Sequence, residues 1–382
     1  MKVFLVARGC PDTGDPQWGN FELDQAKALR NMGHQVTILY VDGRFHKSIF
    51  KEFGFHRHTV DGIEYFGIFL YPGKLALWLG IQVLVKLKEK QLEYIFSKAV
   101  KIYGKPDVIY AHYLGNIACS IKLKKKFNVP VIGIEHWSKL NKEELTEDVR
   151  YMGSIAYKGV DKLISVSESL RNRIREHFGV DSTVVNNMVG EDFFEQEIMA
   201  NQSNGIVKLV SVGSLIQRKG YDLLVEALHL LPKNYSWSLT IIGDGEDKVK
   251  LQGMVKEYDL EDRIHFVGKK YKNEIIEIMH NSNAFVLASR AETFGVVYIE
   301  ALSQGLPVIA TSCGGPEEFV NDKNGILIPT DNVKVLKEAL ETMLEKMDTY
   351  DKCFIAEECK RKFSPQVIGK KVSDILGGVK FL

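Results

Sequence analysis

The sequence has few cysteines, no excess of either charge and no long uninterrupted apolar run. Its five cysteines are scattered and form no CxxC pair, which argues against a disulfide framework and a zinc site and predicts reduced thiols. The formal net charge of +1 argues against a dedicated nucleic-acid binder, because neutralising many phosphates needs a clear basic excess. No stretch is long enough to span a bilayer, and residues 1–9 (MKVFLVARG) lack the features of a signal peptide. We therefore expect a cytoplasmic protein that binds no nucleic acid.

The chain is long enough for two domains, since 382 residues exceed what one core usually organises. Short apolar runs alternate with amphipathic stretches, which is typical of parallel βαβ units. A polar break at Met199–Gly205 has the composition of a linker, and the alternation restarts after it. The sequence therefore predicts an α/β chain of two tandem Rossmann-like domains, residues 1–200 and 205–362.

The expected strands follow this alternation through both domains. In the first domain they are Lys2–Val6, Gln35–Tyr40, Val108–Tyr110, Val131–Ile134 and Lys162–Val166, with a helix at Phe21–Met32. In the second they are Val207–Val212, Ser238–Ile242, His265–Phe266, Ala284–Leu287, Pro307–Ala310 and Ile326–Ile328. Ligands of open α/β sheets bind at the carboxyl ends of the strands, so a central cleft faced by both domains is the expected site.

The densest chemical signal is the segment Ser289–Thr311, which follows an expected strand. Gly295 allows a close turn, and Val296–Ser303 is predicted to be a helix whose free N–H groups and dipole suit a diphosphate. Glu292 lies in the loop, and Glu300 lies about one and a half turns into the helix. A random pair of glutamates would be solvated surface charges, but this pair flanks a strand–glycine–helix turn. One carboxylate can therefore reach each end of a bound nucleotide-sugar.

This segment resembles the Glu-x7-Glu signature of the retaining glycosyltransferases of the group 1 / family 4 class. The resemblance implies the GT-B fold, with two Rossmann-like domains facing a central cleft and a final helix within residues 363–382 that crosses back to the first domain. It implies that Glu292 contacts the donor sugar and that Glu300 holds the ribose hydroxyls. It also implies that the amides of Phe294, Gly295 and Val296 bind the phosphates.

Two adjacent cations, Arg218 and Lys219, follow the first expected strand of the second domain. Cations at the start of a helix oppose its dipole, so their placement favours a bound anion over an ordinary basic helix start. They would neutralise the β-phosphate of the leaving nucleotide, which gains charge in the transition state. The segment Val212–Asp222 resembles the family's G-R-L-x-x-x-K-G motif, with Ser214 where an arginine is frequent.

Two turns of the second domain give weaker signals. Gly243 lies in a glycine-rich turn after a strand, and Lys270 follows Gly268 in another. Many surface turns have the same composition. In the family, the corresponding turns lie near the nucleotide and its base, so both residues are candidates for donor binding.

The first domain offers a glycine and two histidines. Gly19, in the segment Gln17–Phe21, permits close approach of a diphosphate to a helix N-terminus, although no GxGxxG fingerprint follows the first strand. His112 and His136 end two strands on the same side of the expected sheet. A histidine at such a position is more often structural. However, His136 matches a family position near the donor sugar, whereas His112 is a candidate on the acceptor side.

The region 65–105 combines apolar and basic residues. Tyr65–Tyr71 and Leu75–Val85 are rich in aromatic and aliphatic side chains, and lysines follow them. This composition suits an anionic membrane surface, and a core helix with a solvated basic face explains it equally well.

Together these features predict a metal-independent, retaining glycosyltransferase that needs no cofactor. Its donor would be a UDP- or GDP-linked sugar, and its acceptor a saccharide or a lipid-linked sugar in surface polysaccharide or glycolipid biosynthesis. The alternatives are a nucleotide-sugar epimerase of the same fold and a non-catalytic nucleotide-sugar-binding subunit. The retained Glu292 and Lys219 count against the subunit, and the Glu-x7-Glu context counts against the epimerase.

Overall fold

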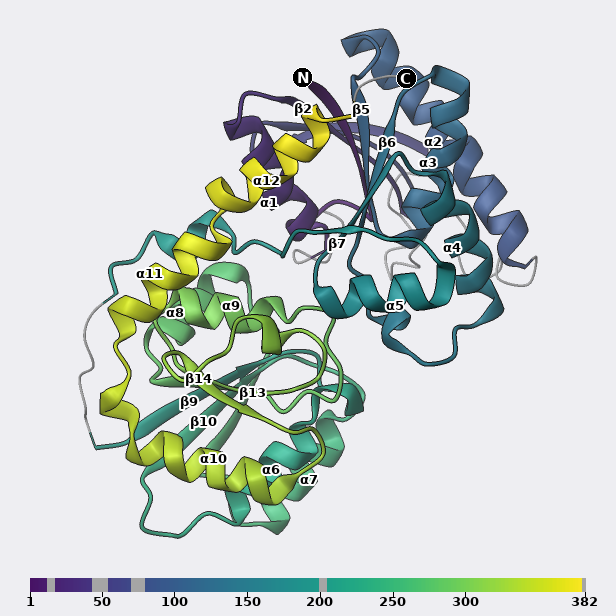
Figure 1. Cartoon of the computed structure of the whole chain (residues 1–382). Helices are drawn as coiled ribbons and strands as arrows, with labels where there is room; N and C mark the ends of the chain where they lie inside the picture. The colour runs from purple at the N-terminus through teal and green to yellow at the C-terminus, as the bar shows by residue number, and fades with distance from the viewer. Residues whose placement is uncertain (12–17, 43–53, 70–79, 199–204, 380–382) are drawn as a thin grey trace. The chain divides into compact units, whose positions relative to one another are not determined.

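The computed structural model describes residues 1–11, 18–42, 54–69, 80–198 and 205–379. The chain divides into two compact units. Unit 1 comprises Met1–Asn186 together with Pro365–Leu382, and unit 2 comprises Asn187–Ser364. Each unit has one sheet of mainly parallel strands with helices packed on it (Figure 1).

Unit 1 contains a sheet in the order β3-β4-β2-β1-β5-β6-β7-β8, in which only β3 runs antiparallel to its neighbour. The strands are β1 (Lys2–Ala7), β2 (Gln35–Asp42), β3 (Gly54–Val60), β4 (Ile63–Phe69), β5 (Val108–His112), β6 (Val131–Glu135), β7 (Lys162–Ser165) and β8 (Thr183–Val184). The central strands β5 and β6 are buried at every residue, as expected of parallel strands covered on both faces. The strand order reverses between β1 and β5, because β2 lies on one side of β1 and β5 on the other.

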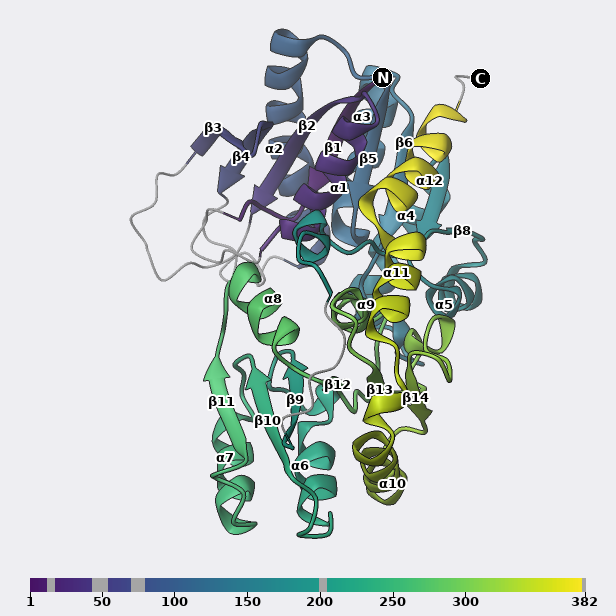
Figure 2. The same ribbon diagram turned by 90° about the vertical axis from the view of Figure 1, so that its left-hand side faces the viewer.

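The helices of unit 1 form two groups on the sheet. They are α1 (Asn20–Asn31), α2 (Ile81–Tyr103), α3 (Leu114–Phe127), α4 (Glu147–Gly159), α5 (Glu168–Phe178) and α12 (Pro365–Gly377). Helix α1 packs against α12, whereas α3 packs against both α2 and α4. Figure 2 shows α1 and α12 side by side, although they come from opposite ends of the chain.

Unit 2 contains a fully parallel sheet in the order β11-β10-β9-β12-β13-β14. The strands are β9 (Val207–Val212), β10 (Trp237–Ile242), β11 (Ile264–Gly268), β12 (Ala284–Val286), β13 (Val308–Thr311) and β14 (Gly325–Ile328). The helices are α6 (Tyr221–His229), α7 (Lys248–Glu257), α8 (Lys272–His280), α9 (Val296–Ser303), α10 (Val333–Glu345) and α11 (Lys352–Phe363). The strand order reverses between β9 and β12, which is where open α/β sheets bind their ligands.

The boundary between the units lies earlier than the sequence predicted. The polar composition of Met199–Gly205 indicated a boundary near residue 200, but the structure places it between Asn186 and Asn187. The reason is that the segment after Asn186 packs on unit 2: Gln304 Nε2 donates a hydrogen bond of 2.5 Å to Phe193 O in the 3₁₀ helix η3 (Glu191–Phe194). At the other end, the transition falls between Ser364 and Pro365, against the predicted residues 362 and 363.

The interpretation of Tyr65–Tyr71 as part of a membrane face is wrong for the residues that the structure describes there. Tyr65 and Phe66 lie in β4 with no exposed surface, because helices α1 and α2 pack on this strand. Residues 70–79 of the proposed segment, and Gln17 of the opening motif, lie outside the described residues. Among the described residues, no helix has the length and apolar character needed to cross a membrane.

Candidate active site

The core of the candidate site is an ion pair between two neighbouring loops of unit 2. Lys219 lies in the 3₁₀ helix η4 (Gln217–Lys219) after β9, and Glu292 lies in the loop after β12. Lys219 Nζ lies 2.6 Å from Glu292 Oε1, and Arg218 Nη1 lies 3.6 Å from Glu292 Oε2. Because β9 and β12 flank the reversal of strand order, the pair occupies the expected ligand position of the sheet.

Glu292 is an ionised carboxylate in a buried setting, with 6% of its surface exposed. Burial raises its pKa. The charge of Lys219, the hydrogen bonds from Lys219 and Ser289, and the charge of Arg218 together lower the pKa by more than burial raises it. The net pKa therefore lies below the ordinary value of a glutamate. Ser289 Oγ donates a hydrogen bond of 2.7 Å to the same Oε1 atom that Lys219 contacts. Ser289 was not among the predicted site residues, although it lies only three residues before Glu292.

A glycine brings the two loops together. Gly220 has a positive φ of 66°, and a Cβ atom on it would lie 1.9 Å from Ala288 O. Any side chain at this position would push the loop of Lys219 away from the loop of Glu292. Gly243, a predicted donor-binding residue, plays a similar part, because a Cβ on it would lie 1.9 Å from Gly213 O. Glycine is therefore required at position 243 because two backbone segments approach each other closely there.

Helix α9 begins four residues after Glu292. Its N-cap is Gly295 in the left-handed conformation, with φ of 90° and ψ of 57°. Phe294 is buried, and the first N–H groups of the helix have no intrahelical acceptor, so the amides of residues 294–296 can bind an anion. Glu300 lies further along the same helix and is partly exposed. The loop and α9 thus carry both acidic candidates on one continuous segment of unit 2.

Lys270 follows β11, so it lies at the carboxyl ends of the strands, as Lys219 and Glu292 do. Its Nζ lies 2.8 Å from Glu274 Oε1 in the first turn of α8. Lys270 is therefore paired with a carboxylate four residues away, as Lys219 is paired with Glu292.

In unit 1, the structure brings the two predicted histidines together. The rings of His112 and His136 are stacked, with centroids 5.4 Å apart and planes inclined by 15°. His136 is partly exposed, and its ring also meets Phe21 at 4.7 Å and Tyr113 at 4.8 Å. His112 is fully buried, and neither of its ring nitrogens has a hydrogen-bond partner among the described residues. Burial, followed by the charge of Arg8, lowers the pKa of His112 to about 3, so its imidazole is neutral.

Gly19 is the N-cap of α1 and adopts the left-handed conformation, with φ of 83°. A Cβ on it would lie 2.8 Å from Gly9 O, so the loop after β1 requires glycine for its own packing.

A partly buried ion pair that was not predicted lies beside these histidines. Arg8 follows β1, and its Nε lies 2.9 Å from Oε1 of Glu22, which has no exposed surface. The guanidinium of Arg8 also lies over the rings of Trp18, at 4.7 Å, and Tyr113, at 4.0 Å. The only signal in the sequence was a charged residue directly after an apolar strand.

A second missed residue is Glu135, the last residue of β6. Its Oε1 accepts hydrogen bonds of 2.9 Å from the amides of His136 and Trp137, and its Oε2 accepts one of 2.8 Å from Tyr157 Oη. Burial raises its pKa to about 7, although these hydrogen bonds act in the opposite direction. Glu135 therefore fixes the backbone conformation of His136 and Trp137.

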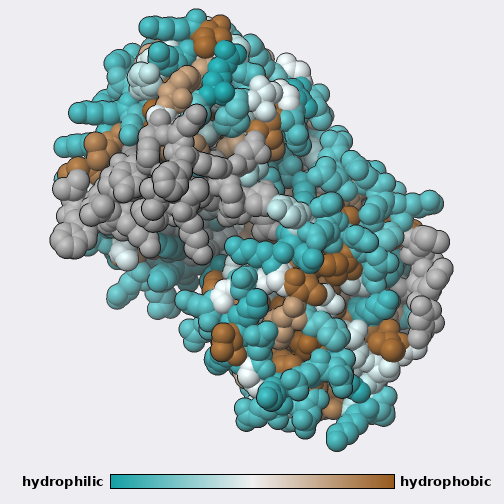
Figure 3. Space-filling model, turned by 180° about the vertical axis from the view of Figure 1, so that it is seen from behind, coloured by the Kyte–Doolittle hydropathy of each residue, from teal (hydrophilic) through white to brown (hydrophobic). Residues whose placement is uncertain are grey.

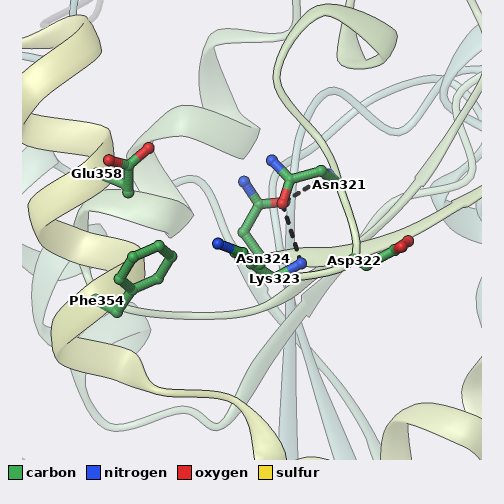
Figure 4. A pocket seen from close by; sticks show the side chains of 6 residues that line it. All are labelled: Asn321, Asp322, Lys323, Asn324, Phe354 and Glu358. Atoms are coloured by element: carbon green, nitrogen blue, oxygen red, sulfur yellow. Dashed lines mark hydrogen bonds between the residues drawn. The ribbon is translucent and has the colours of Figure 1, made fainter.

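A hollow lined by Asn321, Asp322, Lys323, Asn324, Phe354 and Glu358 lies on unit 2 (Figure 4). The turn 321–324 precedes β14, so the hollow lies at the amino ends of the parallel strands, opposite the edge that carries Glu292. The amides of both asparagines donate to Phe319 O within the turn. The hollow is therefore distinct from the candidate active site. Within the part of the chain that the structure describes, no group of three or more His, Cys, Asp or Glu residues could hold a metal ion.

Comparison with known proteins is consistent with this geometry. Residues 192–355 match the family model of glycosyl transferases group 1, and residues 20–193 match that of glycosyltransferase family 4. An uncharacterised glycosyltransferase from Methanocaldococcus jannaschii is 29% identical over 325 residues, which are 81% of this chain and 88% of the relative. The amylovoran biosynthesis glycosyltransferase AmsD from Erwinia amylovora is 25% identical over 282 residues, covering 71% of this chain and 78% of the relative.

Among solved structures, that of HepE from Anabaena in complex with UDP has a TM-score of 0.75 at 18% identity. The match covers 99% of this chain and 100% of that chain. The architecture is the GT-B fold, as the sequence predicted. With the two family matches running from residue 20 to residue 355, the chain belongs to the group 1 / family 4 glycosyltransferases.

Proposed function

We propose that the protein transfers a sugar from a UDP- or GDP-linked donor to a saccharide or lipid-linked acceptor, with retention of the anomeric configuration. The observation that carries the proposal is the buried Lys219–Glu292 pair at the reversal of strand order in unit 2. Its relative AmsD acts in amylovoran biosynthesis, and structures of HepE hold UDP and UDP-glucose, which supports a nucleotide-sugar donor and a role in surface polysaccharide assembly.

In this proposal, unit 2 binds the donor. The amides of Phe294, Gly295 and Val296 and the cations Arg218 and Lys219 hold the diphosphate, and Glu300 holds the ribose hydroxyls. Glu292 contacts the donor sugar. Because these cations can stabilise the charge that develops on the departing diphosphate, the proposed reaction needs no metal and no cofactor.

Unit 1 would bind the acceptor, with His136 as a sugar or acceptor contact and His112 stacked against it. The acceptor hydroxyl oxygen forms a bond to the anomeric carbon on the face from which the phosphate oxygen departs. The hydroxyl proton passes to a phosphate oxygen, and a nucleoside diphosphate is released. Retention follows because the new bond forms on the same face as the broken bond.

The first test is a thermal-shift screen with UDP, GDP, ADP, CMP and NAD on the wild type, Lys219→Ala and Glu300→Ala. We expect one nucleoside diphosphate to stabilise the wild type, by roughly 3 kcal/mol at a concentration one hundred times Kd, and the two variants to lose most of this effect. Lys323→Ala, which removes a lysine from the opposite edge of unit 2, is the matched control. Stabilisation by NAD alone, or a diphosphate response unchanged in both variants, would overturn the donor-site assignment.

A second assay separates transferase activity from the alternative activities. Incubation of the protein with the donor identified above and no acceptor should leave the donor sugar unaltered. An epimerase would release free nucleotide and an altered sugar, and a non-catalytic subunit would turn over no donor with any acceptor.

We also propose that the exposed face of α2 contacts an anionic membrane. Val83, Leu87 and Tyr94 are 40%, 38% and 47% exposed. Lys86 and Lys90 are exposed between them, and Lys98 is exposed one turn after Tyr94. These residues follow the spacing of one helical face, and Glu89 and Glu93 lie beside it. The lysines of α3 contribute less than the sequence implied, because Lys122 and Lys126 pair with Glu93, and Lys124 pairs with Asp161. On the face that Figure 3 shows, the exposed apolar side chains form separate patches among hydrophilic ones.

Sedimentation with vesicles tests this face. We expect binding to vesicles that contain phosphatidylglycerol but not to pure phosphatidylcholine, and at least about tenfold weaker binding for Lys86→Glu/Lys90→Glu, since each lysine near such a surface contributes about 1 kcal/mol. Lys334→Glu/Lys337→Glu on α10 is the control for net charge. Equal binding by both double variants would contradict the proposal. Such binding would support a cytoplasmic location at the inner face of the membrane.

A further inference from the structure

Arg290 lies between Ser289 and Glu292 and makes an unusual number of polar contacts. Its Nη1 and Nη2 each lie 2.9 Å from one carboxylate oxygen of Asp222, in the first turn of α6. Its Nε lies 2.6 Å from Asp331 Oδ1, and Nη1 also donates 2.5 Å to Gln217 O. The side chain is 22% exposed. A planar guanidinium is the only side chain that can meet these acceptors at once.

The backbone around Arg290 is joined to the same segment. Arg290 N donates a hydrogen bond of 2.8 Å to Arg218 O, and Arg218 Nη1 donates one of 2.8 Å to Ala291 O. The contact from Arg290 Nη1 to Gln217 O adds a third connection between the two loops. These loops carry Lys219 and Glu292, whose atoms meet at 2.6 Å. A shift of either loop would therefore separate the catalytic pair.

We propose that Arg290 is a positioning residue of the donor site, which holds η4 against the loop after β12 so that Lys219 reaches the diphosphate. Asp222 is its principal partner, because the two-oxygen contact fixes the plane of the guanidinium. The inference rests on the proposed function, since it assigns Arg290 a role through Lys219 and Glu292. It adds a residue that the Glu-x7-Glu pattern itself does not include.

A purely stabilising ion pair is the competing explanation, and the affinity for two ligands distinguishes the two. Lys219 is proposed to contact the β-phosphate, which UDP has and UMP lacks. Loss of positioning should therefore weaken UDP and leave UMP nearly unchanged, whereas general destabilisation would weaken both or neither. If the nucleotide screen selects another base, its diphosphate and monophosphate replace UDP and UMP.

The variants are Arg290→Gln, Arg290→Lys and Asp222→Asn, measured by calorimetry and by steady-state transfer. We expect the ratio of UMP Kd to UDP Kd to fall about tenfold in Arg290→Gln and kcat to fall at least as much, since small misplacements of catalytic groups have large effects. Arg290→Lys should restore little, because an ammonium group cannot make the two-oxygen contact. Arg171→Gln is the matched control, since Arg171 contacts both oxygens of Asp181 at 2.7 and 3.0 Å in unit 1.

Asp222→Asn keeps the proposal testable if the arginine variants fold poorly, because it retains the shape of the side chain. An unchanged UMP-to-UDP ratio in folded Asp222→Asn and Arg290→Gln would overturn the inference. Lys219→Ala separates this failure from that of the proposed function. If Lys219→Ala lowers the ratio and Arg290→Gln does not, only the positioning role fails. If Lys219→Ala leaves the ratio unchanged, the donor-site assignment fails and the positioning role fails with it.

Discussion

Replacing Glu292 with glutamine should lower kcat by about 10²- to 10³-fold, the range seen when one preorganised polar group is removed from an active site. Glutamine keeps the size of the side chain and can still accept the hydrogen bonds of Ser289 and Lys219 at Oε1. It removes only the negative charge that faces the donor sugar in the proposed site. The same change removes the negative charge that attracts Lys219, so the affinity for the nucleoside diphosphate should be unchanged or higher.

This combination of a lower kcat and an undiminished diphosphate affinity is the signature of the assigned role. Steady-state kinetics and calorimetry measure the two quantities, and thermal unfolding verifies that the variant is folded. Glu358→Gln provides the control, because Glu358 also pairs with two basic side chains in unit 2, Arg361 and Lys362, but lines the hollow at the opposite edge of the sheet. A Glu292→Gln variant with full activity, or one that loses diphosphate affinity in proportion to kcat, would refute the assignment.

The parallel strands were predictable because they are buried on both faces and form continuous apolar runs. The predicted Val207–Val212 has the observed bounds of β9, and Gln35–Tyr40 lies within β2. The hairpin of β3 and β4 was missed for the opposite reason. Strand β3 alternates partly buried and exposed residues and contains His56, Arg57 and His58, so its composition does not indicate a strand. An apolar run such as Tyr65–Phe69 fits a buried strand and a membrane face equally well from sequence alone.

The candidate site was predictable where its chemistry lies within one short segment. Glu292, Gly295 and Glu300 are close in the chain, and their spacing carries the signal. The partners Arg290 and Asp222 are 68 residues apart, and Arg8 and Glu22 come from a strand end and a helix. Such pairs depend on the strand order of a finished sheet, which places the ends of β9 and β12 side by side. The sequence showed the charged residues but could not show which of them would meet.

Replacing Glu22 with glutamine should destabilise unit 1 by about 2 kcal/mol. Glu22 is fully buried and accepts hydrogen bonds from Arg8 N, Nε and Nη2, so its loss leaves a cation in a site that was built around an anion. Arg8 is 29% exposed, and solvent screening therefore reduces the penalty below the range for a fully buried pair. Thermal and denaturant unfolding measure the change, and Glu168→Gln, which breaks an exposed pair with Arg171, should have almost no effect.

The pH dependence of this effect identifies its electrostatic origin. Burial raises the pKa of Glu22, but the charge and hydrogen bonds of Arg8 lower it further, and the net pKa lies below 4.5. The stabilisation is therefore complete above the unfolded-state pKa and is lost as the pH falls through the folded-state pKa. The stability difference between wild type and Glu22→Gln should shrink below pH 4.5. Glu135 has the opposite pH dependence. Its pKa is raised to about 7 in the folded protein, so its ionisation lowers the stability as the pH rises from 4.5 to above 7. A Glu22→Gln effect that is constant from pH 7 to pH 3 would show that packing, and not the charge of Arg8, accounts for the stabilisation.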